Sequence, residues 1–350
     1  MSVERPTTAQ PAAAAALGGP PLLEATDLEI SYPIRRGLVG ALRREPRATV
    51  RAVDGVSLQV AKGDMLALVG ESGCGKTTTA RGVLRLVEPV AGTVHFGGRD
   101  ITHAKAGELR ALRRRMQLIY QDPYESLDPR FRVRATIEEP LAIHRVGSRA
   151  ERRRRSLEAL ERTGLTPPEL YQDRYPHELS GGQRQRVAIA ASLVLDPELL
   201  VADEPASMLD VSVRAGVLSL LATLRKDADL GILMITHDFS TAAHFADRIA
   251  VMYLGRIVEE GPAREVVHRP AHPYTRALLS AVPPRNPREH RRPQILRGEP
   301  PDPTAVPSGC RFHPRCPLAQ DRCKTIDPEL RPVSAAEPSG GRHRAACVLV

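Results

Sequence analysis

Short runs of apolar residues alternate with longer amphipathic stretches along most of this chain. Residues 22–31 and 53–60 alternate apolar with polar positions, which is typical of half-buried strands. Four continuous apolar runs predict buried strands, because each is short and is bounded by polar or turn-forming residues: 64–69, 199–202, 231–236 and 249–254.

Apolar positions at helical spacing occupy the segments between these strands. They predict helices at 76–86, 181–194 and 211–224, and a helical subdomain inserted at about 122–180. Strands that alternate with helices favour a largely parallel sheet covered on both faces. The expected fold class is therefore α/β, with the main domain at 21–268.

Three regions depart from this pattern. Residues 1–20 are expected to be a disordered tail, because their alanine run lies between prolines and lacks the basic start and long apolar stretch of a secretory signal. The Arg-rich stretch 35–51 is expected to form a loop or hairpin insertion. Beyond about residue 270 the composition shifts to Pro, Arg and His, which indicates a separate C-terminal extension at 269–350.

Charge and composition limit the possible partners. The net charge of +9 suits an anionic partner such as nucleic acid, acidic lipid or nucleotide. Aromatic residues make up only 3% of the chain, which disfavours a platform that stacks single-stranded bases. No apolar run approaches the ~20 residues that span a bilayer. The sequence therefore predicts a cytoplasmic protein whose membrane role, if any, is peripheral.

Residues 70–77 read Gly-Glu-Ser-Gly-Cys-Gly-Lys-Thr, which is a complete phosphate-binding pattern between a predicted strand and a predicted helix. Glycines let successive backbone N–H groups point at phosphate oxygens at the start of a helix. Lys76 would reach the β- and γ-phosphates, and the Thr77 hydroxyl would bind Mg²⁺. The ATP-binding residues expected here are Gly70, Ser72, Gly73, Cys74, Gly75, Lys76, Thr77 and Thr78.

A pair of carboxylates follows the apolar run 199–202. Asp203 would emerge at the carboxyl end of a buried strand, where doubly wound sheets bind ligands. We expect Asp203 to hold Mg²⁺ and Glu204 to polarise an attacking water. Both segments together predict an ATP-hydrolysing P-loop NTPase.

With these residues in place, the chain resembles the ATP-binding cassette (ABC) family over residues 22–268. Tyr120-Gln121-Asp122-Pro123 resembles the Q-loop, Ser207-Met208-Leu209-Asp210 the D-loop and Ile235-Thr236-His237-Asp238 the switch segment. The resemblance implies that Gln121 contacts Mg²⁺ and the lytic water, that His237 contacts the γ-phosphate, and that Tyr32 stacks on adenine. The implied catalytic residues are Glu204, His237 and Gln121.

The segment Leu179-Ser180-Gly181-Gly182-Gln183 is similar to the signature motif of this family. The resemblance implies that Ser180, Gly181, Gly182 and Gln183 cap the γ-phosphate held by a second ATPase subunit, expected to be a different chain. Two cassettes would then close head to tail around two ATP molecules.

The C-terminal part narrows the resemblance. Residues 272–279 and 120–130 resemble segments of oligopeptide, dipeptide and nickel importers, and the Arg-rich insertion after Tyr32 resembles their F-type ATPase. The resemblance implies a peripheral subunit on the cytoplasmic face of the membrane. Its partners would be two transmembrane permease subunits and an extracytoplasmic substrate-binding protein, with no nucleic acid. Nickel complexes and glutathione remain alternatives to a di- or oligopeptide substrate.

Four of the five cysteines lie in the C-terminal extension, with the spacing C-x5-C-x6-C-x23-C: Cys310, Cys316, Cys323 and Cys347. A reducing compartment favours metal over disulfides. Zinc ribbons usually carry paired C-x2-C knuckles, whereas four isolated thiolates can ligate a [4Fe–4S] cluster. The importer resemblance implies such a cluster here. A zinc ion, and thiols that are free or disulfide-linked, remain alternatives.

The expected function is ATP hydrolysis that energises import of di- or oligopeptides or related small solutes. A soluble ABC ATPase acting on nucleic acid or ribosomes is the alternative from another class. Such proteins usually carry two cassettes or a long coiled coil, and neither is visible in this sequence. An exporter ATPase is a further alternative, which the C-terminal segment and its cysteines disfavour.

Overall fold

The computed structural model describes residues 20–34, 49–122, 126–282, 294, 296, 298–333 and 342–350. Most of the expected N-terminal tail and of the Arg-rich insertion lies outside these residues. So do residues 123–125 of the extended Q-loop.

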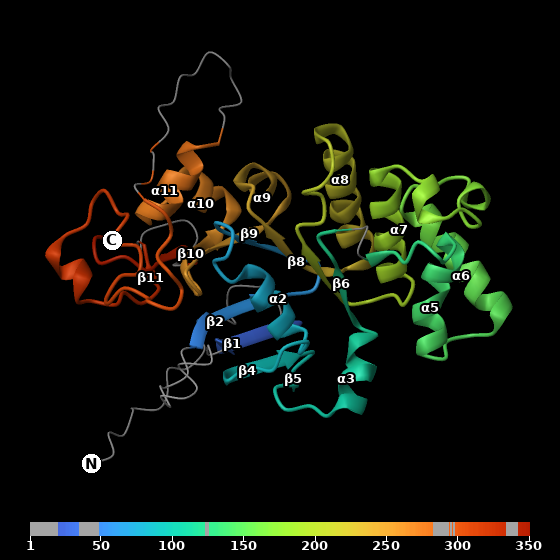
Figure 1. Ribbon diagram of the computed structural model, residues 1–350, viewed down its shortest axis with the longest axis horizontal. Coiled ribbons are helices and arrows are strands. Elements are labelled where there is room, and N and C mark those ends of the chain that lie inside the picture. The colour runs from blue at the N-terminus through green and yellow to red at the C-terminus, as the bar shows by residue number, and fades with distance from the viewer. Residues whose placement is uncertain are drawn as a thin grey trace, which may run out of the picture.

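Among the described residues, the central sheet has eight strands in the order β11-β12-β10-β9-β3-β8-β7-β6 (Figure 1). Its parallel part is β3 (Met65–Val69), β6 (Met116–Ile119), β7 (Leu199–Asp203), β8 (Gly231–Thr236) and β9 (Arg248–Tyr253). Three strands continue it in antiparallel pairing: β10 (Arg256–Pro262), β11 (Arg331–Pro332) and β12 (Arg344–Ala345). The predicted α/β fold with a largely parallel sheet is confirmed.

A second sheet, which the sequence did not predict, is wholly antiparallel in the order β2-β1-β4-β5. Its strands are β1 (Leu23–Pro33), β2 (Thr49–Val60), β4 (Ala91–Phe96) and β5 (Arg99–Asp100). Figure 1 shows these strands and α2 (Lys76–Val83) on one side of the central sheet. One face of that sheet is therefore covered mainly by a second sheet rather than by helices.

Alternate residues of β3 belong to two different hydrophobic cores, as the period of a strand requires. Met65, Ala67 and Val69 pack with helices on one face. Leu66 and Leu68 pack with α2 and the antiparallel sheet on the other. The first face is covered by α8 (Val211–Ala228), α9 (Phe239–Phe245), α10 (Ala263–His268) and α11 (Pro273–Ser280). A further helix, α3 (Ala106–Arg113), contributes Leu112 to the second core.

The predicted helical subdomain has a core of its own. It contains α5 (Val133–Ile143), α6 (Arg149–Arg162), the short turns η2 (Pro168–Leu170) and η3 (Pro176–Glu178), and α7 (Gly181–Leu193). Its core also takes in Val187, Ala190 and Val194, so it continues beyond the expected end near residue 180. Figure 1 shows α5, α6 and α7 at the end of the molecule away from the C-terminal extension.

The C-terminal extension, predicted to be separate, shares the core of the main domain. Tyr274 and Phe312 are fully buried in the first core, and β12 pairs with β10. A few large aromatic side chains achieve this, although the segment has no long apolar run. Between Cys310 and Cys347, the described residues form only a short helical turn, η4 (Asp321–Lys324), and the two-residue strands β11 and β12. No helix among the described residues is both long and apolar enough to cross a membrane.

Candidate functional site

The phosphate loop joins β3 to α2 and depends on glycine for its shape. Gly73 and Gly75 have φ values of 77° and 110°, which residues with a Cβ rarely adopt. A Cβ on Gly75 would also lie 2.2 Å from the carbonyl oxygen of Ala52 on β2. The backbone can therefore turn directly into the N-terminus of α2, where N–H groups and the helix dipole favour an anion.

Lys76 is buried at the start of α2, and its ammonium is held inside the loop. Its Nζ donates hydrogen bonds to the carbonyl oxygens of Gly70 and Glu71, both at 2.8 Å. Cys74 is also buried, and burial raises the pKa of its thiol. Cys74 therefore fills a small position in the loop, and its burial disfavours the thiolate.

Thr77 and Asp203 come together from different parts of the sequence. The Thr77 hydroxyl donates to Oδ1 of Asp203 at 3.2 Å. Asp203 ends β7 and is largely buried, and burial raises the pKa of its carboxyl, with the nearby Glu204 adding to the effect. A buried carboxylate beside a hydroxyl supplies the oxygen ligands that Mg²⁺ prefers, and a cation there would offset the cost of burying the charge.

The three predicted catalytic residues meet at the carboxyl edge of the parallel sheet. Gln121 follows β6, Glu204 follows β7 and His237 follows β8. Nε2 of Gln121 donates to Oε2 of Glu204 at 3.2 Å, and Nδ1 of His237 lies 3.1 Å from Oε1 of Glu204. Glu204 has a φ of 47°, an uncommon value for a residue with a side chain that is often found at functional sites.

The remaining predicted ATP residues surround the same loop. Ser72 and Thr78 lie within the loop and the first turn of α2. Tyr32 lies near the end of β1 and is half-exposed. It pairs with Val50 on β2, two residues from the Ala52 carbonyl that approaches Gly75. Strand pairing thus places Tyr32 on the side of the molecule that carries the phosphate loop.

The signature residues lie at the N-terminus of α7, in the helical subdomain. Ser180 is the N-cap: its Oγ accepts from the N–H of Gln183 at 3.3 Å, while Oε1 of Gln183 accepts from the N–H of Ser180 at 3.0 Å. This capping box joins the two residues to each other and not to the phosphate loop of their own chain. Gly181 and Gly182 follow in the first turn, where Gly182 is buried against α8.

Comparison with known proteins fits this arrangement. Residues 53–207 match the ABC transporter family model, and residues 258–323 match the model of the oligopeptide/dipeptide transporter C-terminal region. The chain is 48% identical over 301 residues to a putative peptide import ATP-binding protein of Brucella ovis, covering 86% of this chain and 92% of the relative. The chain belongs to the ATP-binding subunits of peptide-type ABC transporters.

Two more similarities support membership. The oligopeptide transport ATP-binding protein AppF of Bacillus subtilis is 44% identical over 331 residues, which is 94% of this chain and 97% of AppF. The dimeric cassette MJ0796, solved in a post-hydrolysis state with ADP and Pi, has a TM-score of 0.60 and 28% identity, covering 69% of this chain and 99% of MJ0796.

This ABC subunit is therefore an ATPase coupled to transport, which acts with membrane permease subunits. The alternative of a soluble ATPase acting on nucleic acid or ribosomes gains no support from these relatives.

The four cysteines of the ABC subunit's extension lie near one another, although Cys347 is distant in sequence. All five cysteines of the chain are free thiols. Burial raises the pKa of Cys310 to about 11, and the charges of Cys347, Cys323 and Cys316 add to the rise. The pKa of Cys316 and of Cys347 is also raised by burial and then by neighbouring members of the set. Among the described residues, no three His, Cys, Asp or Glu side chains are arranged to hold a single metal ion.

One contact at the site was not predicted. Glu71, the second residue of the phosphate loop, is bound by Arg315 and Tyr274 of the C-terminal extension. No local pattern signals this contact, because Glu71 and Arg315 are separated by 244 positions.

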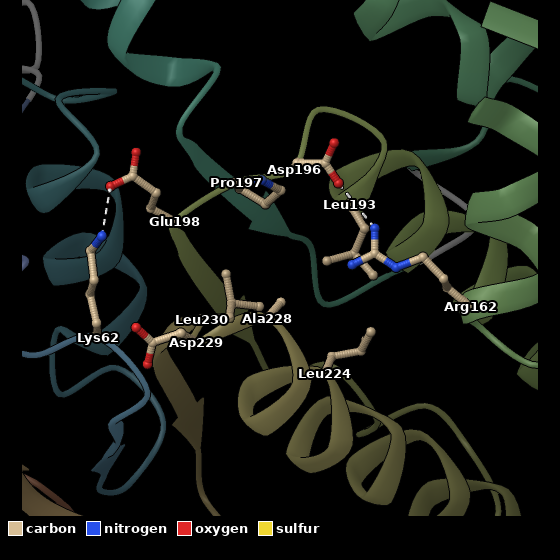
Figure 2. A pocket seen from close by; sticks show the side chains of 10 residues that line it. All are labelled: Lys62, Arg162, Leu193, Asp196, Pro197, Glu198, Leu224, Ala228, Asp229 and Leu230. Carbon is tan, nitrogen blue, oxygen red and sulfur yellow. Dashed lines mark hydrogen bonds and ion pairs between the residues drawn. The ribbon is translucent and has the colours of Figure 1, made fainter. Parts of the chain in front are cut away.

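A hollow of the ABC subunit lies elsewhere, at the amino ends of the parallel strands (Figure 2). It measures about 180 Å³. Four of the charged side chains that line it form pairs: Lys62 with Glu198 at 3.7 Å, and Arg162 with Asp196 at 3.1 Å. Within each pair the positive and negative charges offset each other.

Proposed function

We propose that this ABC ATPase energises the import of di- or oligopeptides at the cytoplasmic face of the membrane. The observation that carries the proposal is that one chain matches both the cassette and the oligopeptide/dipeptide C-terminal region. Relatives named for peptide import and oligopeptide transport match nearly the whole chain. The complex would contain a second ATPase subunit, two transmembrane permease subunits and an extracytoplasmic substrate-binding protein.

Residues from several segments would position ATP in this chain. The loop from Gly70 to Thr78 would receive the phosphates, with Tyr32 against the adenine. Nζ of Lys76 would exchange its two carbonyl partners for phosphate oxygens, which are stronger acceptors. The Thr77 hydroxyl, Asp203 and Gln121 would hold Mg²⁺, which neutralises charge on the β- and γ-phosphates.

Glu204 is the residue that we assign to water activation. Each of its two carboxylate oxygens has a partner: Oε2 accepts from Gln121, and Oε1 lies beside Nδ1 of His237. These contacts would orient the carboxylate toward a water in line with the γ-phosphate. His237 would contact the γ-phosphate itself. Glu204 would thus be held between Gln121, on the side of Mg²⁺, and His237, on the side of the γ-phosphate.

The signature residues would act on ATP held by the partner cassette. Ser180, Gly181, Gly182 and Gln183 begin a helix of 13 residues whose capping groups are satisfied internally. The N-terminus of such a helix favours an anion. The similarity to a cassette solved as a dimer supports head-to-tail closure around two ATP molecules.

We further propose that Cys310, Cys316, Cys323 and Cys347 ligate a [4Fe–4S] cluster. The observation that supports it is that the four cysteines lie near enough to affect one another's thiols, although Cys347 is distant in sequence. A cluster spreads its four thiolate ligands further apart than a single ion does. When bound, it would cross-brace a segment with little regular structure.

Metal analysis of anaerobically purified protein tests the cluster. We expect about four irons and four sulfides per chain, lost in Cys323→Ser and retained in the control Cys74→Ser. One zinc per chain, or no metal in a folded chain, would contradict the proposal.

Uptake of labelled alanine peptides tests the import function. A deletion strain carrying the wild-type gene should take up di- to penta-alanine faster than one carrying Glu204→Gln, with free alanine as the control. Equal peptide uptake by the two strains would show that peptides are not the substrate class, even if the purified chain hydrolyses ATP.

A further inference from the structure

The C-terminal extension reaches into the phosphate loop through one buried ion pair. Arg315 donates two hydrogen bonds to the carboxylate of Glu71, at 2.7 and 3.1 Å. The Arg315 side chain is 7% exposed and that of Glu71 24%. Two parallel bonds in a mostly buried setting are the strong form of an arginine–carboxylate contact.

The backbone of Glu71 is held by two further groups. Its N–H donates to Oη of Tyr274 at 3.0 Å, and its carbonyl oxygen accepts from Nζ of Lys76 at 2.8 Å. Tyr274 belongs to the extension and is fully buried, whereas Lys76 is the phosphate-binding lysine. Glu71 therefore connects the extension to the group that must move when ATP binds.

Arg315 is itself held firmly against the main domain. Its guanidinium lies 6.0 Å from the centre of the Tyr253 ring. The backbone N–H of Arg315 donates to the carbonyl oxygen of Phe312 at 3.0 Å. Phe312 is buried among Tyr253, Tyr274 and His272.

The other arginine of this segment adds a second anchor: Arg311 hydrogen-bonds Asp54 and the carbonyl of Leu254. The segment that carries Cys310 and Cys316 is thus attached to the main domain through both Arg311 and Arg315.

A free carboxylate at Glu71 would work against nucleotide binding. Glu71 lies within a loop whose backbone receives phosphates, and its charge has the same sign as theirs. Arg315 neutralises this charge and keeps the carboxylate on the side of the extension. Removing one member of a buried pair leaves the other charge uncompensated, whereas removing both avoids that cost.

We infer that Arg315 is a positioning residue of the nucleotide site, which holds Glu71 neutralised and turned away from the phosphates. The C-terminal extension is then part of the ATP site and not only an appendage to it. This inference rests on the ATP site assigned above and not on the cluster. It does, however, predict that the state of Cys316, the next residue, is felt at the phosphate loop.

A charge-rescue experiment on the full-length chain tests the inference. Arg315→Met should weaken MgATP binding by about tenfold, the value of a lost charge-assisted contact. Glu71→Gln alone should change it by less than about threefold. The double variant Arg315→Met/Glu71→Gln should recover most of the loss, because no unpaired carboxylate remains. KM for ATP should follow binding, while kcat changes little.

Arg344→Met is the matched control. Arg344 also ties the extension to the main domain through an arginine–carboxylate pair, with Glu260, but on β12 and β10 and away from the phosphate loop. It should leave ATP affinity unchanged. Equal loss in Arg344→Met, or a double variant no better than Arg315→Met, would overturn the inference and point to general destabilisation.

Removal of iron tests the link to the cysteines. Anaerobic chelation should weaken binding of a fluorescent ATP analogue in the wild-type chain but not further in Arg315→Met. Unchanged affinity in iron-free wild type would overturn the link to Cys316. A chain purified without iron would overturn the cluster alone, because the charge-rescue experiment needs no metal.

Discussion

At the scale of residues, the ATP site gathers buried or closely paired charged groups. Asp203 has a buried carboxyl whose pKa is raised by that burial, and Lys76 is turned onto carbonyl oxygens of its own loop. Glu204 has a strained backbone and shares its carboxylate oxygens with Gln121 and His237. Such features cost stability and are typical of a site prepared for a charged ligand.

Glu204→Gln should abolish turnover while leaving ATP binding intact. The amide has the size of the carboxylate but cannot accept a proton from water, and loss of a general base costs about 10²–10⁴ in rate. ATP hydrolysis should fall by at least about 100-fold, with the ATP dissociation constant unchanged within about twofold. Glu198→Gln, at the opposite end of β7, is the control. Undiminished hydrolysis would refute the role given to Glu204.

Asp203→Asn should stabilise the nucleotide-free fold at neutral pH. Burial raises the folded-state pKa of Asp203, so its neutral form is favoured in the fold and its ionised form costs stability. The gain in free energy of unfolding should be about 1 kcal/mol at pH 8 and should shrink as pH falls through the raised pKa toward 3.8.

Urea denaturation across that pH range measures the effect. Asp210→Asn is the control with the opposite sign, because hydrogen bonds from the Val213 N–H and the Ser212 hydroxyl lower the pKa of Asp210. A gain in Asp203→Asn that does not vary with pH would show that charge burial is not its cause.

At the scale of elements, the start of α7 shows how packing and function share a sequence. Ser180 and Gln183 cap the helix, and the two glycines between them differ in their surroundings. A Cβ on Gly182 would lie 2.3 Å from Cγ1 of Val213 on α8, whereas one on Gly181 would have its nearest neighbour at 3.5 Å. Gly182 is thus required for α7 to pack on α8, apart from any contact with nucleotide.

Gly182→Ala should therefore destabilise the nucleotide-free chain by about 1–3 kcal/mol, because the stiff side chain of Val213 must move. Gly181→Ala should have little effect or a slight benefit, because alanine favours the helix. Thermal unfolding of both variants measures the difference. Equal stability of the two would show that α8 adjusts at no cost.

At the scale of the whole molecule, the extension and the main domain share one core. Phe312 and Tyr274 enter the same cluster as the central strands, and β12 lengthens the central sheet through β10. The helical subdomain, with its separate core, lies at the other end (Figure 1). On one side of the nucleotide site, the extension shares the core of the main domain. On the other side, the helical subdomain that carries the signature residues has a core of its own.

Phe312→Ala should lower the free energy of unfolding of the whole chain by about 3–5 kcal/mol, the usual cost of removing a buried aromatic ring. Denaturation followed by tyrosine fluorescence should show one transition, because the core is shared. Leu318→Ala, in the same extension but half-exposed, should have almost no effect. A separate early transition of the extension in the wild-type chain would contradict the shared core.

Features that depend on local pattern could be predicted from the sequence. Four of the described parallel strands, the phosphate loop and the helices 181–193 and 211–228 were predicted to within a few residues, because apolar period and glycine spacing act over short distances. The parallel strand β6 was not predicted. The catalytic residues Gln121, Glu204 and His237 were named from the motifs. The contacts between these three side chains depend on the order of the strands, because β6, β7 and β8 lie side by side in the sheet.

Contacts between segments that are distant in the chain could not be predicted from local pattern. The strands at 22–31 and 53–60 were predicted, but their assembly into a separate antiparallel sheet was not. The two-residue strands β5, β11 and β12 and the aromatic anchors of the extension have weak local signals, because they leave no period. The pair between Arg315 and Glu71 belongs to the same class. Its partners are far apart in the chain and meet because Phe312 and Tyr274 gain more by burial in the shared core than by exposure to water.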